Sequence, residues 1–375
     1  MLRSVPHPLD EYPIHQAPLS VAHSVSSDKN VYDRCYLNLH DRTGDVFAIT
    51  GFGVYTNLGV VDAYLGVRSG DRQVTIRASD ALEDGTRMEQ RVGPYRIEVV
   101  KPLEELRIVV EAGDLGVEAD LHWRGSFPTV DEQPHVWRQG GRITLDACRY
   151  AQVGTWEGTL RVDDQTWELS HDTWVGTRDR SWGIRPVGEP DPAGRTAAET
   201  PADYGFWWTY VPMRFDDFGI LFICQEDGQG HRLLNDAVRV WPDGRVEQLG
   251  WPRYDIHYRP GTRRATGATI SATAEDGKPL VFEVESLGFI GLSTGLGYGG
   301  DPEWNHGRWM GRGHVARVEH DYAAMQQDSD PFAFSMLDHV GHATCDGADG
   351  WGLFEHMSLG AHAPSGFTDF GSVAS

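Results

Sequence analysis

Cysteine is scarce in this chain. Only four cysteines occur among 375 residues, and they lie far apart without any Cys-x-x-Cys pair. This spacing offers neither a zinc-finger motif nor a dithiol redox motif. Cys148 and Cys224 fall within strand-like runs, where we expect them to be small buried apolar residues.

Long hydrophobic runs are also missing. No stretch approaches the roughly 18 apolar residues of a membrane-spanning helix. The first residues, Met1–Ser20, contain prolines and acids instead of the apolar segment of a signal peptide. We therefore expect a cytoplasmic protein with no integral membrane segment.

Positive charge is in the minority. The chain has 33 lysines and arginines against 55 aspartates and glutamates, which gives a formal net charge of −22. Without a basic stripe the chain cannot displace counterions from phosphates, so a nucleic-acid partner is not expected. Anionic membrane surfaces are disfavoured for the same reason. The simplest role of the negative charge is solubility.

Helical periodicity is weak, and short strand-like segments dominate. Segments such as Val46–Ile49, Tyr95–Val100 and Gly219–Ile223 are rich in β-branched and aromatic residues and are bracketed by turn residues. The 44 glycines suit tight turns and bent strands. Only His320–Gln327 has a short helical pattern. The sequence therefore predicts an all-β fold with few short helices, arranged as a sandwich or barrel.

A proline-rich stretch divides the chain near its middle. Pro186–Pro201 contains four prolines and no periodicity, which is typical of a linker. It predicts an N-terminal domain over residues 1–190 and a C-terminal domain over residues 191–375.

A weak internal repeat supports two related halves. Tyr32–Tyr36 resembles Tyr204–Trp208, and Asp62 in one half corresponds to Asp236 in the other. The next acidic landmarks, Asp179 and Glu355, follow these two aspartates after 117 and 119 residues respectively. We therefore expect Asp179 and Glu355 at comparable positions of the two halves, although chance alignment of common strand and turn residues is an alternative.

One segment resembles a known family. A recurrent motif of tandem lipocalin-like proteins is similar to the segment Arg178-Asp179-Arg180-Ser181-Trp182-Gly183-Ile184-Arg185. These proteins are the AttH-like group and the carotenoid 1,2-hydratases (hydroxyneurosporene synthases). The late segment Gly350–Glu355 resembles the corresponding strand in the second half of such proteins. The resemblance implies two tandem lipocalin-like antiparallel β-barrels with an apolar cavity. In the hydratase branch it also implies acid-catalysed addition of water to an isolated double bond. Arg180 stands where the family often has a histidine, which weakens the hydratase interpretation if that histidine transfers protons.

Asp179 is the first candidate for proton transfer. A carboxyl group in a partly apolar pocket has a raised pKa, as a general acid or base requires. We assign Arg185 the role of orienting Asp179, and Glu355 with His356 are secondary catalytic candidates. The alternative is a structural aspartate paired with Arg185 or Arg178.

Aromatic residues near the junction are the candidates for substrate binding. Trp182, Trp207, Trp208 and Tyr210 could give a pocket aromatic walls that stabilise developing positive charge. Trp207 and Trp208 are neighbours in a strand and point to opposite faces, so we expect one of them in the cavity and the other in the core.

Two further residues complete the predicted binding set. Asp236 follows Asn235 in a possible turn-to-strand transition. Trp309 lies in the glycine-rich segment Gly288–Gly313, which we interpret as bent strands and a loop that could cover the pocket.

Three functional hypotheses remain open at this stage. The first is a cofactor-independent enzyme for a terpenoid- or steroid-like substrate, acting by hydration, dehydration, isomerisation or cyclisation. The second is a non-catalytic carrier of an apolar molecule. The third, a metal-dependent barrel enzyme, rests on the late histidines, but His314–His320 and His339–His342 match no metal signature, so no metal ligands are predicted. A homodimer is compatible with all three.

Overall fold

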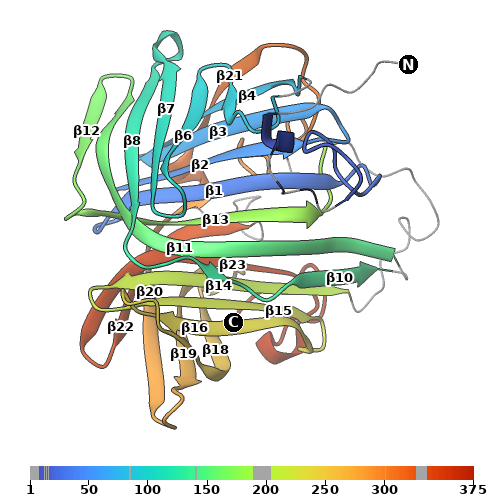
Figure 1. Ribbon diagram of the computed structural model, residues 1–375. Coiled ribbons are helices and arrows are strands. Elements are labelled where there is room, and N and C mark those ends of the chain that lie inside the picture. Colours follow the sequence, from blue (N-terminus) through green and yellow to red (C-terminus); the bar gives the residue numbers. More distant parts are fainter. Residues whose placement is uncertain are drawn as a thin grey trace.

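The computed structural model describes residues 8–11, 13, 15, 17–83, 86–139, 142–188, 204–299, 301–326 and 336–375. Two antiparallel sheets form an upper and a lower body, and they meet along the long strands in the middle of Figure 1. The prediction of an all-β fold is confirmed. Within the described residues no helix is long and apolar enough to cross a bilayer.

The first sheet contains 14 strands within the described residues. They are β1 (Val31–Asp41), β2 (Val46–Tyr55), β3 (Val60–Ser69), β4 (Arg72–Ala81), β5 (Arg91–Val92), β6 (Tyr95–Lys101), β7 (Glu105–Ala112), β8 (Val117–Gly125), β9 (Val130–Asp131), β10 (His135–Gln139), β11 (Arg142–Val162), β12 (Gln165–Leu169), β13 (Trp174–Ile184) and β21 (His314–Asp321). Their main path runs β21-β4-β3-β2-β1-β13-β11-β8-β7-β6-β5. Strand β5 returns to lie near β3 and β4, so this sheet nearly closes into a barrel.

The second sheet contains nine strands within the described part of the chain. They are β14 (Gly205–Phe215), β15 (Gly219–Asp227), β16 (Arg232–Val240), β17 (Val246–Gln248), β18 (Gly250–Tyr258), β19 (Ala265–Thr273), β20 (Pro279–Gly291), β22 (Leu337–Cys345) and β23 (Ala348–Gly360). The sheet bends over its own core, because Phe222 of β15 and Phe282 of β20 touch edge to face at 5.2 Å.

The remaining elements are short. They are the 3-10 helices η1 (Pro8–Glu11), η2 (Gly113–Leu115) and η3 (Ala363–Ser365) and the helix α2 (Tyr322–Met325). The helix predicted over His320–Gln327 is therefore only one turn long, because His320 still pairs in β21 with Gln73 of β4; Gln327 lies outside the described residues. Strand β21 comes from the second half of the sequence but extends the first sheet.

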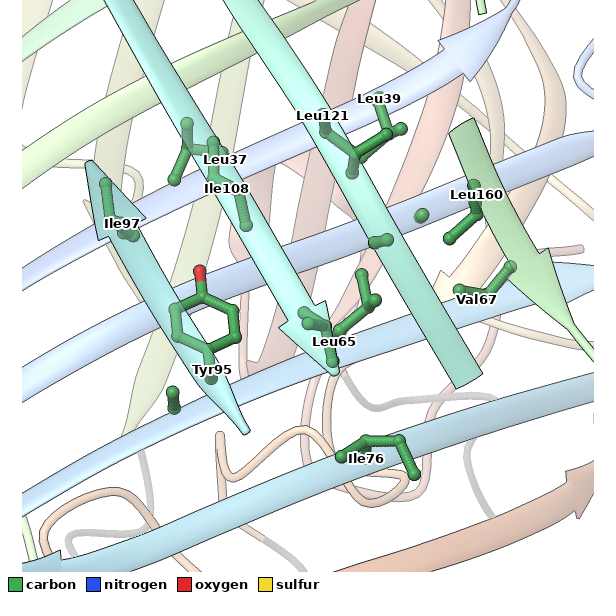
Figure 2. Packing of buried hydrophobic residues seen from close by; sticks show 14 of the residues in the cluster. Leu37, Leu39, Leu65, Val67, Ile76, Tyr95, Ile97, Ile108, Leu121 and Leu160 are labelled. Atoms are coloured by element: carbon green, nitrogen blue, oxygen red, sulfur yellow. The ribbon is translucent and has the colours of Figure 1, made fainter. Parts of the chain in front are cut away.

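The interior of the first sheet is filled by hydrophobic side chains. Figure 2 shows leucines and valines of β1 and β3 facing residues of β6, β7 and β8 across the barrel. Leu37, Ile108 and Leu121 are fully buried there. Close packing of this kind fills the middle of the barrel, whereas Phe52 and Val54 of the same core line a groove at its end.

A second core joins the two sheets. Alternate residues of β1 point in opposite directions, so Leu37 enters the barrel whereas Tyr36 faces the second sheet. Tyr36 belongs to a cluster that also contains Trp208 of β14 and Leu353 of β23. Since β1 is buried on both faces, its sequence lacks the alternation of a half-exposed strand.

The structure bears on three further predictions, which concern two cysteines, the linker and the internal repeat. Cys148, predicted to be buried, is exposed: it lies on the same face of β11 as the core residue Trp156, but at the end of the strand, where it lines the groove that Trp182 also borders. Cys224 is buried as expected. Most of the proposed linker Pro186–Pro201 lies outside the described residues. The repeat is displaced by two residues at its start, because Tyr36 pairs with Asp179 whereas Tyr210, not Trp208, pairs with Glu355.

Candidate functional site

A cavity of about 350 Å³ lies between the two sheets. Strands β1, β11 and β13 form one wall, and β14 and β23 contribute the other. Its chemically distinctive lining residues are the aromatics Tyr32, Tyr36, Trp137, Phe206, Trp208 and Tyr298, the acids Glu132, Asp179 and Glu355, and the bases Arg34, Arg149 and Arg185. Such a mixture of aromatic walls and a few converging polar groups is typical of a small-molecule site.

Asp179 of β13 faces this cavity. Burial raises the pKa of its carboxyl group to about 6, and the nearby charges of Arg149 and Glu355 act in opposite directions on it. No ion pair joins Asp179 to Arg178 or Arg185 within the described residues, so the structural pairing that was the alternative interpretation is not formed; Arg178 instead donates to Gln152 at 2.7 Å. Asp179 therefore faces the cavity without an ion pair among the described residues.

A second acidic group is built from two strands. Asp338 of β22 lies directly opposite Glu355 of β23, and only Glu355 lines the cavity. Burial and the charge of Glu355 raise the pKa of Asp338 well above its ordinary value; burial also raises the pKa of Glu355, although the hydrogen bond with Asp338 opposes this rise. The two carboxyl groups therefore titrate as a pair, and sharing one proton between them avoids two buried like charges. The indole N–H of Trp208 also donates to Glu355.

The positive charge of Arg149 in β11 offsets part of the negative charge of the acidic residues in the cavity. Its guanidinium donates to Glu132 at 2.6 Å and lies 4.6 Å from the ring centre of Tyr210. Burial raises the pKa of Glu132, and the charge of Arg149 opposes that rise. Arg149 and Glu132 thus form a half-buried, mutually neutralised pair at the edge of the cavity.

Four of the residues selected from the sequence line the cavity together. They are Asp179, Arg185, Trp208 and Glu355. Side-chain alternation explains the absence of their neighbours. His356 points into the second sheet, where its Nε2 lies 2.9 Å from the Tyr258 hydroxyl, and Trp207 stacks on His362 at 5.3 Å. As expected, Trp207 and Trp208 thus face opposite sides of β14.

The other four selected residues lie away from the cavity lining. Trp182 is 40% exposed and borders a groove beneath the N-terminal segment, and Trp309 is 50% exposed. Tyr210 is buried beneath Arg149. Asp236 is also buried, and its carboxylate accepts hydrogen bonds from the backbone N–H of Gln133 at 3.2 Å and of Ala237 at 2.9 Å.

Several important residues were not selected from the sequence. Asp338 and Arg34 are buried, and Arg149 pairs with the buried carboxyl group of Glu132. Asp338 and Arg34 lie within strand-like runs, where a charged residue in the interior of a strand was the available signal, although Arg34 directly follows Asp33. That signal does not reveal which strands meet, so their convergence could not be inferred.

This arrangement suits proton transfer. A carboxyl group with a pKa near 6 can both give and accept a proton near neutral pH. Aromatic faces beside it favour apolar groups and developing positive charge. In the described part of the chain, no group of three or more histidine, cysteine, aspartate or glutamate side chains is arranged to hold a metal ion.

Solved structures share this architecture. A putative AttH protein from Nitrosomonas europaea superposes with a TM-score of 0.55 at 11% identity, covering 91% of this chain and 98% of that one. Kievitone hydratase from Nectria haematococca gives a TM-score of 0.50 at 11% identity, covering 94% and 96%. At such low identity the likeness shows the lipocalin-like fold and leaves activity open.

Sequence comparison identifies a family. No curated protein matches the chain. Residues 7–368, however, match a family of unknown function (DUF8625), and this chain belongs to that family.

Proposed function

We propose that this protein is a hydratase-type enzyme that transfers a proton to or from a largely hydrophobic substrate in the cavity between the sheets. The observation that carries this proposal is the position of Asp179. Its carboxyl group has a pKa of about 6 and faces a cavity with aromatic walls. Buried acids of this kind are frequent in catalytic sites.

In the hydration direction, Asp179 protonates one carbon of a substrate double bond. The adjacent carbon becomes electron-deficient, and the ring faces of Trp208 and Tyr36 stabilise its positive charge. Water then forms the new C–O bond and gives up one proton to a carboxylate, either Asp179 or Glu355. The reverse sequence removes water, and loss of a proton from a neighbouring carbon instead moves the double bond.

Arg185 and Asp338 act as positioning residues in this scheme. The charge of Arg185 lowers the pKa of Asp179 and so partly opposes burial. Asp338 lies behind Glu355 and supplies it with a hydrogen bond. The named activity of kievitone hydratase, which shares the fold, is compatible with this reaction class.

Isotope incorporation tests the proposal even while the natural substrate is unidentified. The protein is incubated in D₂O with a panel of terpenoid and steroid alkenes and tertiary alcohols, both uncharged and bearing a carboxylate, and mass spectrometry detects deuterium in recovered material. We expect incorporation with the wild type and a loss of about 100-fold or more with Asp179→Asn, as for removal of a general acid. Asp172→Asn is the matched control, because Asp172 is exposed at the start of the same segment.

A carrier of an apolar molecule is the second candidate. Glu355 is already hydrogen-bonded to both Trp208 and Asp338. A carrier without catalytic activity needs the same hydrogen bonds to satisfy its buried polar groups, which favours this candidate. In that case panel members bind in the cavity but acquire no deuterium, and Asp179→Asn behaves like the wild type. Undiminished incorporation in Asp179→Asn would instead remove Asp179 from the mechanism.

A further inference from the structure

Arg34 of β1 is a buried cation that has no matching anion among the described residues. Its side chain lines the cavity, and the residue is only 6% exposed. Within the described residues its guanidinium has no hydrogen bond and no ion pair; it lies over the ring of Tyr298, whose centre is 5.0 Å away. Asp62 is close enough to affect its charge but does not pair with it. A guanidinium offers five N–H donors, and leaving them unsatisfied in a buried site is costly.

Strand register places Arg34 in a polar row. Arg34 pairs with Ser181 of β13, and Ser181 pairs with Arg149 of β11, so the three side chains stand side by side across the cavity wall. Arg149 is already neutralised by Glu132. The row therefore contains one unmatched positive charge with a hydroxyl beside it.

The row lies at a defined distance from Asp179. Tyr36 and Asp179 form the next inward-facing pair along the same strands, two residues from Arg34 and Ser181. Two residues of strand correspond to about 7 Å. Arg185, which also lines the cavity, has no hydrogen bond or ion pair of its side chain in the described part of the chain, and its guanidinium lies over the ring of Tyr32.

We infer that the substrate carries an anionic oxygen group, such as a carboxylate or an ionised enol or phenol, which binds Arg34 beside Ser181 while its apolar body reaches Asp179. This inference rests on the proposed function and narrows its substrate class. A carboxylate can accept two parallel hydrogen bonds from one guanidinium, which supplies the missing acceptors of Arg34. The anionic group fixes the position of the molecule, and the separation of about 7 Å sets which carbon lies near the acid.

A matched pair of probes tests this inference. Isothermal titration calorimetry compares 2-naphthoate with 2-naphthamide, which has the same ring system and nearly the same shape but no charge. We expect the wild type to bind 2-naphthoate about tenfold more tightly or better, as for a charge-assisted pair. In Arg34→Gln this preference disappears because 2-naphthoate binds more weakly, whereas the affinity for 2-naphthamide stays within about twofold. Arg34→Lys keeps the charge and retains part of the preference.

Arg180→Gln is the control. Arg180 lies on the opposite face of β13, paired with Asp33 at 2.8 Å, so its replacement removes the same charge from outside the cavity. Circular dichroism confirms the fold of each variant. The inference is overturned if the wild type fails to bind 2-naphthoate at millimolar concentration, if it binds both probes equally, or if Arg34→Gln retains the preference. If Arg34→Gln does not fold, the affinities of the wild type for 2-naphthoate and 2-naphthamide still test whether the cavity prefers an anion.

The binding test of the anion site and the deuterium test of catalysis can succeed or fail independently. Asp179→Asn should lose deuterium incorporation but keep the preference for 2-naphthoate, because Arg34 is intact. A wild type that prefers 2-naphthoate but incorporates no deuterium would uphold the anion site and refute the catalytic proposal. A wild type that incorporates deuterium but binds both probes equally would uphold the catalytic proposal and refute the anion site.

Discussion

The phenol of Tyr36 in β1 donates a 2.5 Å hydrogen bond to Asp338 in β22, although 302 positions separate the two residues. This bond passes from the first sheet to the second, directly behind the carboxyl groups of the cavity. Both side chains are buried. It therefore links the packing of the two sheets to the state of the Asp338–Glu355 pair.

Removing this bond should destabilise the protein. Tyr36→Phe leaves a buried carboxyl group without one of its donors, and we expect the free energy of unfolding to fall by about 1–3 kcal/mol. Urea denaturation measures the change. Tyr32→Phe serves as the control, since Tyr32 is a buried tyrosine of the same strand whose hydroxyl makes no hydrogen bond within the described residues. Equal stabilities of the two variants would show that the bond contributes little.

The acid pair should tolerate an amide but not a hydrocarbon. Asp338→Asn keeps an acceptor for Tyr36 and a donor for Glu355, so we expect the unfolding free energy to change by about 1 kcal/mol or less. Asp338→Leu removes both and should cost about 2–4 kcal/mol, because Glu355 and Tyr36 stay buried with one partner fewer. Thermal and urea unfolding compare the variants. A leucine variant as stable as the asparagine variant would argue against a hydrogen bond between Asp338 and Glu355.

Stability should depend on pH through Asp179. Burial raises its folded-state pKa to about 6, above the ordinary value of 3.8. The protonated form is thus favoured by folding, and this contribution is complete below the ordinary pKa and is lost as the pH rises through 6. Relative to Asp179→Asn, the wild type should lose up to about 3 kcal/mol of unfolding free energy between pH 4 and pH 7. A pH-independent difference between the two proteins would contradict the raised pKa.

Asp62 should anchor the loop that follows β20. Its carboxylate accepts a 2.6 Å hydrogen bond from the backbone N–H of Gly307, in a segment that packs against the first sheet. In Asp62→Ala we expect faster amide hydrogen exchange around Gly307, because this tether is lost. Asp236→Ala is the counterpart control in β16, and it should accelerate exchange near Gln133 instead. Unchanged exchange at Gly307 would show that other contacts hold the loop.

Cysteine reactivity should single out one thiol. Cys148 is exposed, whereas Cys35, Cys224 and Cys345 are buried. The native protein should therefore react rapidly with one equivalent of Ellman's reagent, and with all four equivalents after denaturation. Cys148→Ser should abolish the rapid phase, and a rapid phase that survives this change would contradict the exposure of Cys148.

Strand content was accessible from the sequence because β-branched residues, glycines and turn pairs act locally. The alternation rule also assigned Trp207 and Trp208 to opposite faces, since that depends only on strand geometry. Local signals failed for Cys148, because its exposure depends on where along β11 the barrel opens into a groove. They failed also for the site neighbours Trp182 and His356, which alternation turns away from the cavity.

The sequence by itself determined the all-β class, the choice of Asp179 and Glu355 as acids worth testing, and the weak repeat that relates them. Only the tertiary structure decided that the cavity lies between the sheets, that Asp338 stands behind Glu355, and that Arg34 stays unmatched. The reason is that these relationships join strands far apart in the chain. Backbone hydrogen bonding between strands is nearly independent of side chains, so the packing of the whole molecule decides which distant side chains meet.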